Sequence, residues 1–154
     1  AYAPCFLDSR RLVYYAQDNR TQARLRLHEL GGKERNLLRV AGIAYPACDA
    51  ARGRVYFHAI ETFRYLHPLN DLFVYDFAKG RKRRLTQGLR AREVSLSPDG
   101  KTLAYALNSA STSHLLLGDA DDPQKTARIL LRNPRFEQIY TPRFSPDGRY
   151  IAFS

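Results

Sequence analysis

The sequence predicts an all-β fold built from repeated units of four antiparallel strands. The first observation is a Ser-Pro-Asp-Gly core that occurs twice, with the two copies 48 residues apart. The second is that each copy precedes a short run rich in β-branched and aromatic residues, which is typical of a strand. Repeat periods of 20 to 50 residues indicate stacked or circular architectures. We therefore expect a β-propeller, whose blades are four-stranded antiparallel sheets.

The Ser-Pro-Asp-Gly core predicts a tight turn between the first two strands of a blade. Ser suits the first turn position, Pro presets φ at the second, Asp tolerates the third and Gly relieves the fourth. The predicted turn residues are Ser97, Pro98, Asp99 and Gly100 in one copy and Ser145, Pro146, Asp147 and Gly148 in the other. Degenerate copies share this layout near Asp8 and Ala50, and the aromatic residues that close the four copies are Tyr14, Phe57, Tyr105 and Phe153.

Strand-like segments follow the turns in a regular order. The second strands are expected at Leu12–Ala16, Val55–Ile60, Leu103–Leu107 and Tyr150–Phe153, and the third strands at Ala23–Leu30, Asp71–Ala78 and His114–Asp119. Short fourth strands are expected at Asn36–Val40, Arg83–Thr86 and Ala127–Leu131. The nearly continuous apolar character of the second strands indicates sheets that are covered on both faces. Residues 1–154 are therefore expected to be part of one propeller, with blades at about 1–40, 41–87 and 88–132 and a partial blade at 133–154.

The pattern Ser-Pro-Asp-Gly-[Arg/Lys]-x-[Ile/Leu]-Ala-[Phe/Tyr], together with the earlier stretch Asp76–Thr86, resembles the propeller repeats of the TolB family. The resemblance implies a non-catalytic scaffold that binds a protein or peptide partner and is periplasmic or otherwise exported. It also implies a ring of six blades, which three and a half blades cannot close. We therefore expect a fragment of a longer chain, or self-association through open blade edges.

A binding segment is expected in the connection between the second and third strands of the second blade. Phe63, Arg64, Tyr65 and His67 give this loop an aromatic and cationic character. Loops on a rigid scaffold carry function, and Arg and Tyr often anchor interfaces. The alternative is a solvated loop whose aromatic side chains pack under a neighbouring blade.

Other classes of site are not supported by the sequence. No nucleophile elbow, zinc-protease motif or phosphate-binding glycine loop is present, so we expect no catalytic residue and no cofactor within these residues. The alternative is a propeller that gates or positions substrate for a peptidase of the prolyl-oligopeptidase, tricorn or metallopeptidase kind. His58, Glu61, His67 and Asp71 lack the spacing of a known metal site, and the Asp119, Asp121 and Asp122 turn lacks the EF-hand register. No apolar stretch is long enough to span a bilayer.

Charge and cysteine content add two expectations. The net charge is +10, but it is spread along the chain, so nucleic-acid binding is not favoured. The densest basic cluster, residues 79–84, is expected to be a solvated hairpin at the outer rim. Cys5 and Cys48 occupy the same repeat position on adjacent blades and are expected to be buried free thiols, because equivalent strands of neighbouring blades usually lie too far apart for a disulfide.

Overall fold

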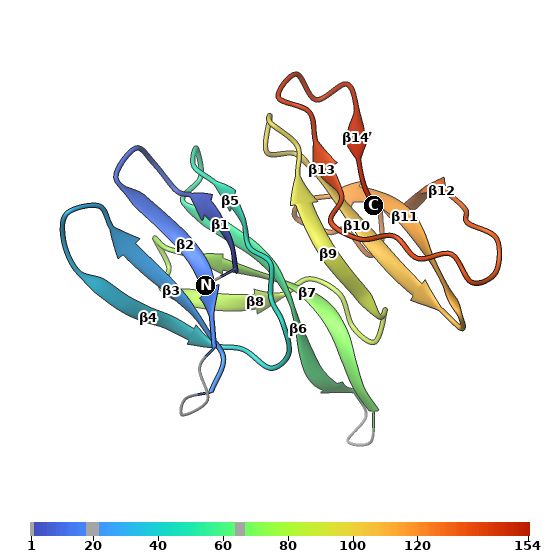
Figure 1. Cartoon of the computed structure of the whole chain (residues 1–154), viewed down its shortest axis with the longest axis horizontal. Coiled ribbons are helices and arrows are strands. Elements are labelled where there is room, and N and C mark those ends of the chain that lie inside the picture. The colour runs from blue at the N-terminus through green and yellow to red at the C-terminus, as the bar shows by residue number, and fades with distance from the viewer. Residues whose placement is uncertain (1, 18–21, 64–66) are drawn as a thin grey trace.

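The computed structural model describes residues 2–17, 22–63 and 67–154. The described residues form three four-stranded antiparallel sheets and one two-stranded sheet, which lie side by side (Figure 1). The all-β prediction and the propeller-like architecture are confirmed. Within this part of the chain, no helix has the length and apolar character that crossing a membrane requires.

Each complete sheet runs in simple order from its first strand to its fourth. The first contains β1 (Tyr2–Phe6), β2 (Arg11–Ala16), β3 (Arg24–Glu29) and β4 (Glu34–Arg39). The second contains β5 (Ala47–Asp49), β6 (Arg54–Phe63), β7 (His67–Asp76) and β8 (Arg81–Arg84). The third contains β9 (Ala91–Leu96), β10 (Thr102–Ser109), β11 (Thr112–Asp119) and β12 (Arg128–Leu131), and the last sheet pairs β13 (Arg143–Phe144) with β14 (Ile151–Ala152).

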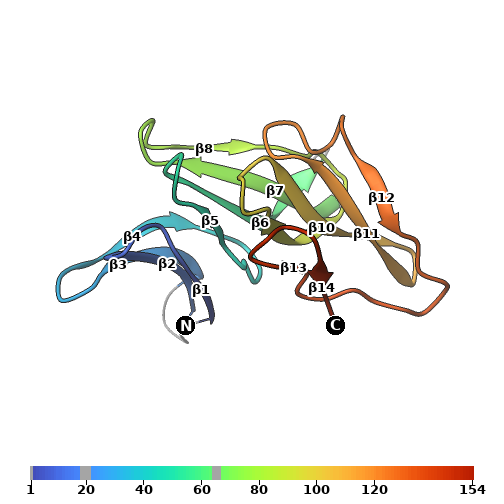
Figure 2. The same cartoon turned by 90° about the horizontal axis from the view of Figure 1, so that it is seen from above.

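The first strands of successive sheets converge. β1 contacts β5, and β9 contacts both β5 and β13, so these four strands line one side of the assembly while β4, β8 and β12 lie at the outside (Figure 2). This radial arrangement is that of propeller blades, and we use the word blade for each sheet. A cavity of about 420 Å³ opens between the converging strands and includes Cys5, Cys48, Ser95 and Phe144 in its wall.

Apolar side chains fill the spaces between adjacent blades. Val13, Leu25 and Phe57 belong to a core between the first two blades, and Tyr56 and Leu103 belong to a second core between the next two. A third core, around Ala104 and Ile139, joins the third blade to the β13–β14 sheet. Burial on both faces explains why the central strands read as continuous apolar runs.

The Ser-Pro-Asp-Gly turns are held by their own side chains. Ser97 Oγ donates to Asp99 Oδ1 at 2.6 Å, and the Lys101 N–H donates to the same oxygen at 3.0 Å. Asp147 accepts the equivalent bonds from Ser145 and Arg149. These donors, with the serine hydroxyl as the largest cause, lower the pKa of both Asp99 and Asp147.

The expectation of free thiols at Cys5 and Cys48 is wrong, because the two residues form a disulfide. Their Cα atoms are 5.6 Å apart, inside the range that a disulfide spans. Equivalent strands of neighbouring blades are distant at the rim, but β1 and β5 are the converging first strands. The converging first strands bring the two cysteines within disulfide distance.

Candidate functional site

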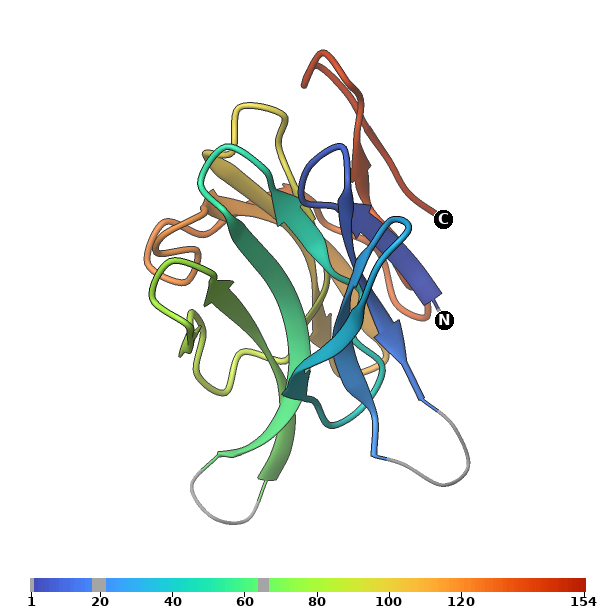
Figure 3. The ribbon, with the colours of Figure 1, turned by 90° about the vertical axis from the view of Figure 1, so that its left-hand side faces the viewer.

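The two ends of the blades differ in character. We call the end that carries the Ser-Pro-Asp-Gly turns the turn end, and the opposite end the loop end. The described ends of the β2–β3 and β6–β7 hairpins both point to the loop end, away from the turns (Figure 3). The loop end also carries the connections between blades at residues 41–46 and 132–142.

Strained backbone gathers at the loop end of the third and fourth blades. Among the described residues, five that are not glycine have positive φ: Arg90 (60°), Glu93 (57°), Ala110 (49°), Phe136 (68°) and Thr141 (48°). Such conformations are uncommon for side-chain-bearing residues, and they cluster at ligand clamps and functional loops. Ala110 lies in a short hairpin, where positive φ matches the strand twist. Arg90 lies in the connection that enters β9, and Phe136 and Thr141 lie in the connection that enters β13. Glu93 lies within β9, where the pairing with β10 shifts register.

Hydrogen bonds hold these connections against the β10–β11 hairpin. The Asn108 N–H donates to the Arg90 carbonyl oxygen at 3.2 Å, and Gln138 Nε2 donates to the Ser111 carbonyl oxygen at 3.0 Å. Thr112 Oγ1 lies 2.8 and 2.7 Å from the carbonyl oxygens of Pro134 and Glu137, and these two acceptors share its single O–H. The 132–142 connection is therefore fixed on both sides of Phe136.

Phe136 is displayed by this fixed connection. Its side chain is 81% exposed, although a large apolar residue usually gains free energy from burial. Tyr140 follows four residues later and is 44% exposed, with the Arg92 guanidinium 4.9 Å from its ring centroid. Arg92 Nη2 also donates to Gln138 Oε1 at 3.2 Å. Aromatic and arginine side chains of this kind are frequent anchors of protein interfaces.

A buried histidine joins the second blade to Glu93, the residue of β9 that has positive φ. The Glu93 N–H donates to His58 Nδ1 at 3.3 Å, and the His58 ring makes an edge contact with Tyr45 at 5.9 Å between centroids. Burial, followed by the positive charge of Arg92, lowers the pKa of His58 to about 4. His58 is therefore neutral at physiological pH and positions the backbone of Glu93.

Glu93 links the same network to the fourth blade. The Thr141 N–H donates to Glu93 Oε2 at 3.3 Å, and burial raises the pKa of the Glu93 carboxyl. Glu93 and Thr141 are 48 residues apart, which is the same period that separates the two Ser-Pro-Asp-Gly turns. The repeat period was the signal that could have identified this pair from the sequence.

A groove opens at the loop end between the first two blades. It has a volume of about 530 Å³, and its wall includes Ala23, Arg39, Gly42, Ile60 and Glu61. Ile43, in the connection beside it, is 53% exposed. Volumes of this size are ordinary for ligand pockets.

The predicted binding segment is only partly described. Phe63 ends β6 and His67 begins β7, and the two residues are paired across the hairpin. Arg64 and Tyr65 lie outside the described residues. The segment belongs to a hairpin of the loop end, and its role in binding remains a prediction.

Three of the four residues considered as metal ligands, His58, Glu61 and Asp71, have separate partners. His58 faces Glu93, Glu61 pairs with Lys82 and Arg84, and Asp71 is buried among donors from residues 84–89. His67 begins β7. Within the described residues, no three side chains of His, Cys, Asp or Glu lie close enough to hold a metal ion.

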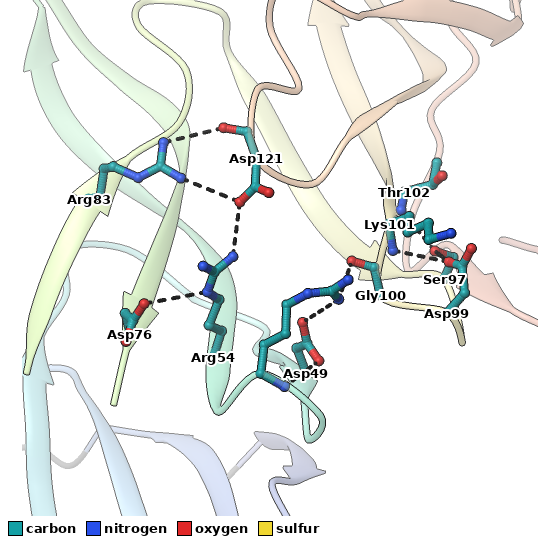
Figure 4. A network of polar contacts seen from close by, with 11 residues as sticks. Asp49, Arg54, Asp76, Arg83, Ser97, Asp99, Gly100, Lys101, Thr102 and Asp121 are labelled. Carbon is teal, nitrogen blue, oxygen red and sulfur yellow. Dashed lines mark hydrogen bonds and ion pairs between the residues drawn. The ribbon is translucent and has the colours of Figure 1, made fainter. Parts of the chain in front are cut away.

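The basic cluster at residues 79–84 is partly neutralised by acidic neighbours. Lys82 pairs with Glu61, and Arg84 Nη2 lies 2.5 Å from Asp71 Oδ2. Arg83 reaches Asp121 of the third blade, which also accepts from Arg54 at 2.9 Å (Figure 4). Residues 81–84 form the exposed rim strand β8. The Arg83 side chain of this strand joins the second blade to the third.

Converging four-stranded sheets with paired turns define this chain as consecutive blades of a β-propeller. Solved structures that it is similar to agree with this class. TolB from Acinetobacter baumannii superposes with a TM-score of 0.75 at 16% identity, covering 99% of this chain and 37% of that one. A TolB-like protein from Agrobacterium tumefaciens gives 0.76 at 16% identity, covering 93% and 49%.

Peptidase propellers are also among the similar structures. A puromycin-hydrolyzing peptidase of Mycobacterium tuberculosis gives a TM-score of 0.62 at 17% identity, covering 84% of this chain and 20% of that one. No protein-family model and no curated protein sequence matches the chain. The chain spans less than half the length of these structures, and the similarity shows the fold.

Proposed function

We propose that these blades belong to a non-catalytic scaffold that binds a peptide segment of a protein partner at the loop end. The observation that carries this proposal is the strained, hydrogen-bonded connection that exposes Phe136 beside Tyr140. Backbone strain is retained where the surrounding structure enforces it, and an exposed aromatic residue on a fixed loop loses little conformational entropy on binding. The predicted segment Phe63, Arg64, Tyr65 and His67 would extend the same binding surface.

Selection of peptides from an unbiased display library against the native gene product tests this function. Selected peptides are expected to bind the wild-type protein and to lose at least about tenfold in affinity on Phe136→Ala, because an interface anchor contributes more than about 1.4 kcal/mol. The matched control is Phe6→Ala, which removes an exposed phenylalanine at the turn end of the first blade. Peptides that bind both variants as well as the wild type would reject the loop end as the site.

The partner and the compartment belong to the same proposal. The Cys5–Cys48 disulfide supports an exported protein, because disulfides persist in oxidising compartments. The similarity to TolB structures supports a periplasmic location and a protein partner. Fractionation of the producing cells is expected to place the native protein outside the cytoplasm, and recovery from the cytoplasm with reduced cysteines would oppose this.

A propeller that positions substrate for a peptidase is the second candidate, supported by the similarity to puromycin-hydrolyzing peptidases. Release of a free amino acid from an aminoacyl amide such as puromycin by the native gene product would favour it over the scaffold. A native product without hydrolytic activity that still binds selected peptides would favour the scaffold.

A further inference from the structure

A small cationic cavity lies at the outer corner of the second blade, away from the loop-end surface. Its volume is about 70 Å³, and its wall is formed by Arg54, Val74, Asp76, Lys79, Arg81 and Arg83. Since about 10 to 15 Å³ of such space admits one water molecule, the cavity has room for several waters or one tetrahedral oxyanion. Its size therefore suits a single small ion.

The strand register places the charges on one face of the sheet. Arg54 of β6, Asp76 of β7 and Arg81 of β8 are direct neighbours across the sheet, and Val74 and Arg83 form the next row. Residues separated by two along a strand point to the same face. Four positive side chains thus surround one carboxylate in the cavity wall.

The existing ion pairs leave an excess of positive charge. Arg54 Nε lies 3.4 Å from Asp76 Oδ2, and Arg54 and Arg83 both reach Asp121, which orients these two guanidinium groups (Figure 4). In the described part of the chain, neither the Lys79 ammonium nor the Arg81 guanidinium takes part in a salt bridge. Each guanidinium has five N–H donors, so unused donors remain on all three arginines.

We propose that this cavity binds a phosphate-type oxyanion. Arg81 and Lys79, neither of which forms a salt bridge within the described residues, supply positive charge, while Arg54 and Arg83, held in place by Asp121, supply fixed donors. Guanidinium groups match the geometry of phosphate oxygens, and a lysine adds a mobile point charge. The anion is either a soluble phosphate compound or the phosphate ester of a lipid headgroup.

Phosphorus NMR of inorganic phosphate, titrated with the native protein at constant ionic strength, tests the site. The wild type is expected to show a saturable shift that sulfate competes away. The double variant Lys79→Gln/Arg81→Gln is expected to lower the affinity about tenfold, because two exposed charge contacts together contribute about 1.4 kcal/mol. Lys33→Gln/Arg35→Gln, at the corresponding hairpin of the first blade, is the matched control and is expected to change the affinity less than about twofold.

Co-sedimentation with vesicles distinguishes the two sources. A headgroup ester would be identified if the protein sediments with phosphatidylcholine vesicles that contain phosphatidylglycerol, but not with pure phosphatidylcholine vesicles. The Lys79→Gln/Arg81→Gln variant should then no longer sediment with the vesicles. Phosphate binding without such co-sedimentation would identify a soluble ligand. The proposal is overturned if phosphate gives no saturable signal, or if the first-blade control weakens binding as much as the double variant.

Discussion

At the residue scale, His58 shows how a side chain with familiar catalytic chemistry serves the architecture. Its ring is buried, accepts a hydrogen bond from the Glu93 backbone and contacts Tyr45. A neutral imidazole meets these contacts, whereas an imidazolium would lose the acceptor at Nδ1 and stand beside the Arg92 charge. His58 therefore accepts the hydrogen bond from the Glu93 backbone of the third blade only while its own imidazole ring is neutral.

The pH dependence of stability follows from this placement. In the unfolded chain, His58 takes up a proton at the ordinary histidine pKa of 6.5. In the folded protein, the pKa of His58 is lowered to about 4. Stability is therefore complete above pH 6.5 and falls by about 3 kcal/mol as the pH drops to 4. Urea unfolding at several pH values measures this, and His58→Gln is expected to remove the slope while His28→Gln retains it. A wild type with equal stability at pH 7 and 4.5 would contradict the assignment.

Gly118 occupies a position without space for a side chain. A Cβ atom there would lie 2.6 Å from the Pro123 carbonyl oxygen and 2.8 Å from its Cα, so backbone would have to move. Gly118→Ala is expected to destabilise the protein by about 1 to 3 kcal/mol in urea unfolding. At Gly32 the nearest atoms are 3.6 Å away, so Gly32→Ala is the control and is expected to leave stability nearly unchanged or slightly higher. Equal effects of the two changes would show that the Pro123 contact relaxes freely.

At the element scale, Asp71 organises the connection that leads from the second blade to the third. Its side chain is fully buried and accepts bonds from Thr86 Oγ1 at 2.6 Å and from the N–H groups of Gly88 and Leu89 at 2.9 and 3.2 Å. Arg84 Nη2 completes the set at 2.5 Å. An ionised carboxylate, with no donor of its own, suits four surrounding donors.

Asp71→Asn tests this connection. The amide NH₂ would face donors, and the Arg84 charge would lose its closest partner, so a loss of about 3 kcal/mol in unfolding free energy is expected. Asp122→Asn removes a carboxylate of the exposed pair with Lys125 and is expected to stay within about 0.5 kcal/mol. A similar result for the two variants, measured by denaturant unfolding, would mean that the connection does not depend on the buried carboxylate.

The elements themselves were largely predictable from sequence, and the loop-end site was not. The turns at Asp99 and Asp147 have local chemistry that specifies their conformation, and the continuous apolar runs around Phe57 and Tyr105 reflect burial on both faces. Phe136, in contrast, has no local motif, because its positive φ is imposed by hydrogen bonds from a hairpin about 25 residues earlier. Long-range contacts of this kind leave no pattern in the neighbouring sequence.

At the scale of the whole molecule, adjacent blades are joined by different means at different radii. The disulfide joins the converging strands β1 and β5, the apolar cores fill the middle, and Arg54 and Arg83 meet Asp121 near the rim. At the turn end, Arg52 Nη1 donates to the Gly100 carbonyl oxygen at 3.0 Å while pairing with Asp49 (Figure 4). The first two blades are therefore joined by a disulfide and an apolar core, and the second and third by an apolar core, rim ion pairs and a turn-end hydrogen bond.

Reduction of the disulfide measures how much the innermost link contributes. The disulfide closes a loop with a sequence separation of 43. The loss of chain entropy in the unfolded state then stabilises the folded protein by about 4 kcal/mol. Adding a phosphine reductant is expected to lower the unfolding free energy of the wild type by about that amount. Cys5→Ser/Cys48→Ser should have the lower stability from the start and be insensitive to reductant. A wild type unaffected by full reduction would show that the other links suffice.

We infer that the loop end, and not the turn end, contacts the partner. Photo-crosslinking in the producing cells tests it most directly, with a photoreactive amino acid placed in the native gene product at Phe136 or, as the control at the turn end, at the exposed residue Pro98. We expect a discrete crosslinked species from position 136, whose formation a selected peptide reduces, and none from position 98. A peptide-sensitive crosslink from position 98 alone would contradict the claim and move the binding surface to the Ser-Pro-Asp-Gly turns.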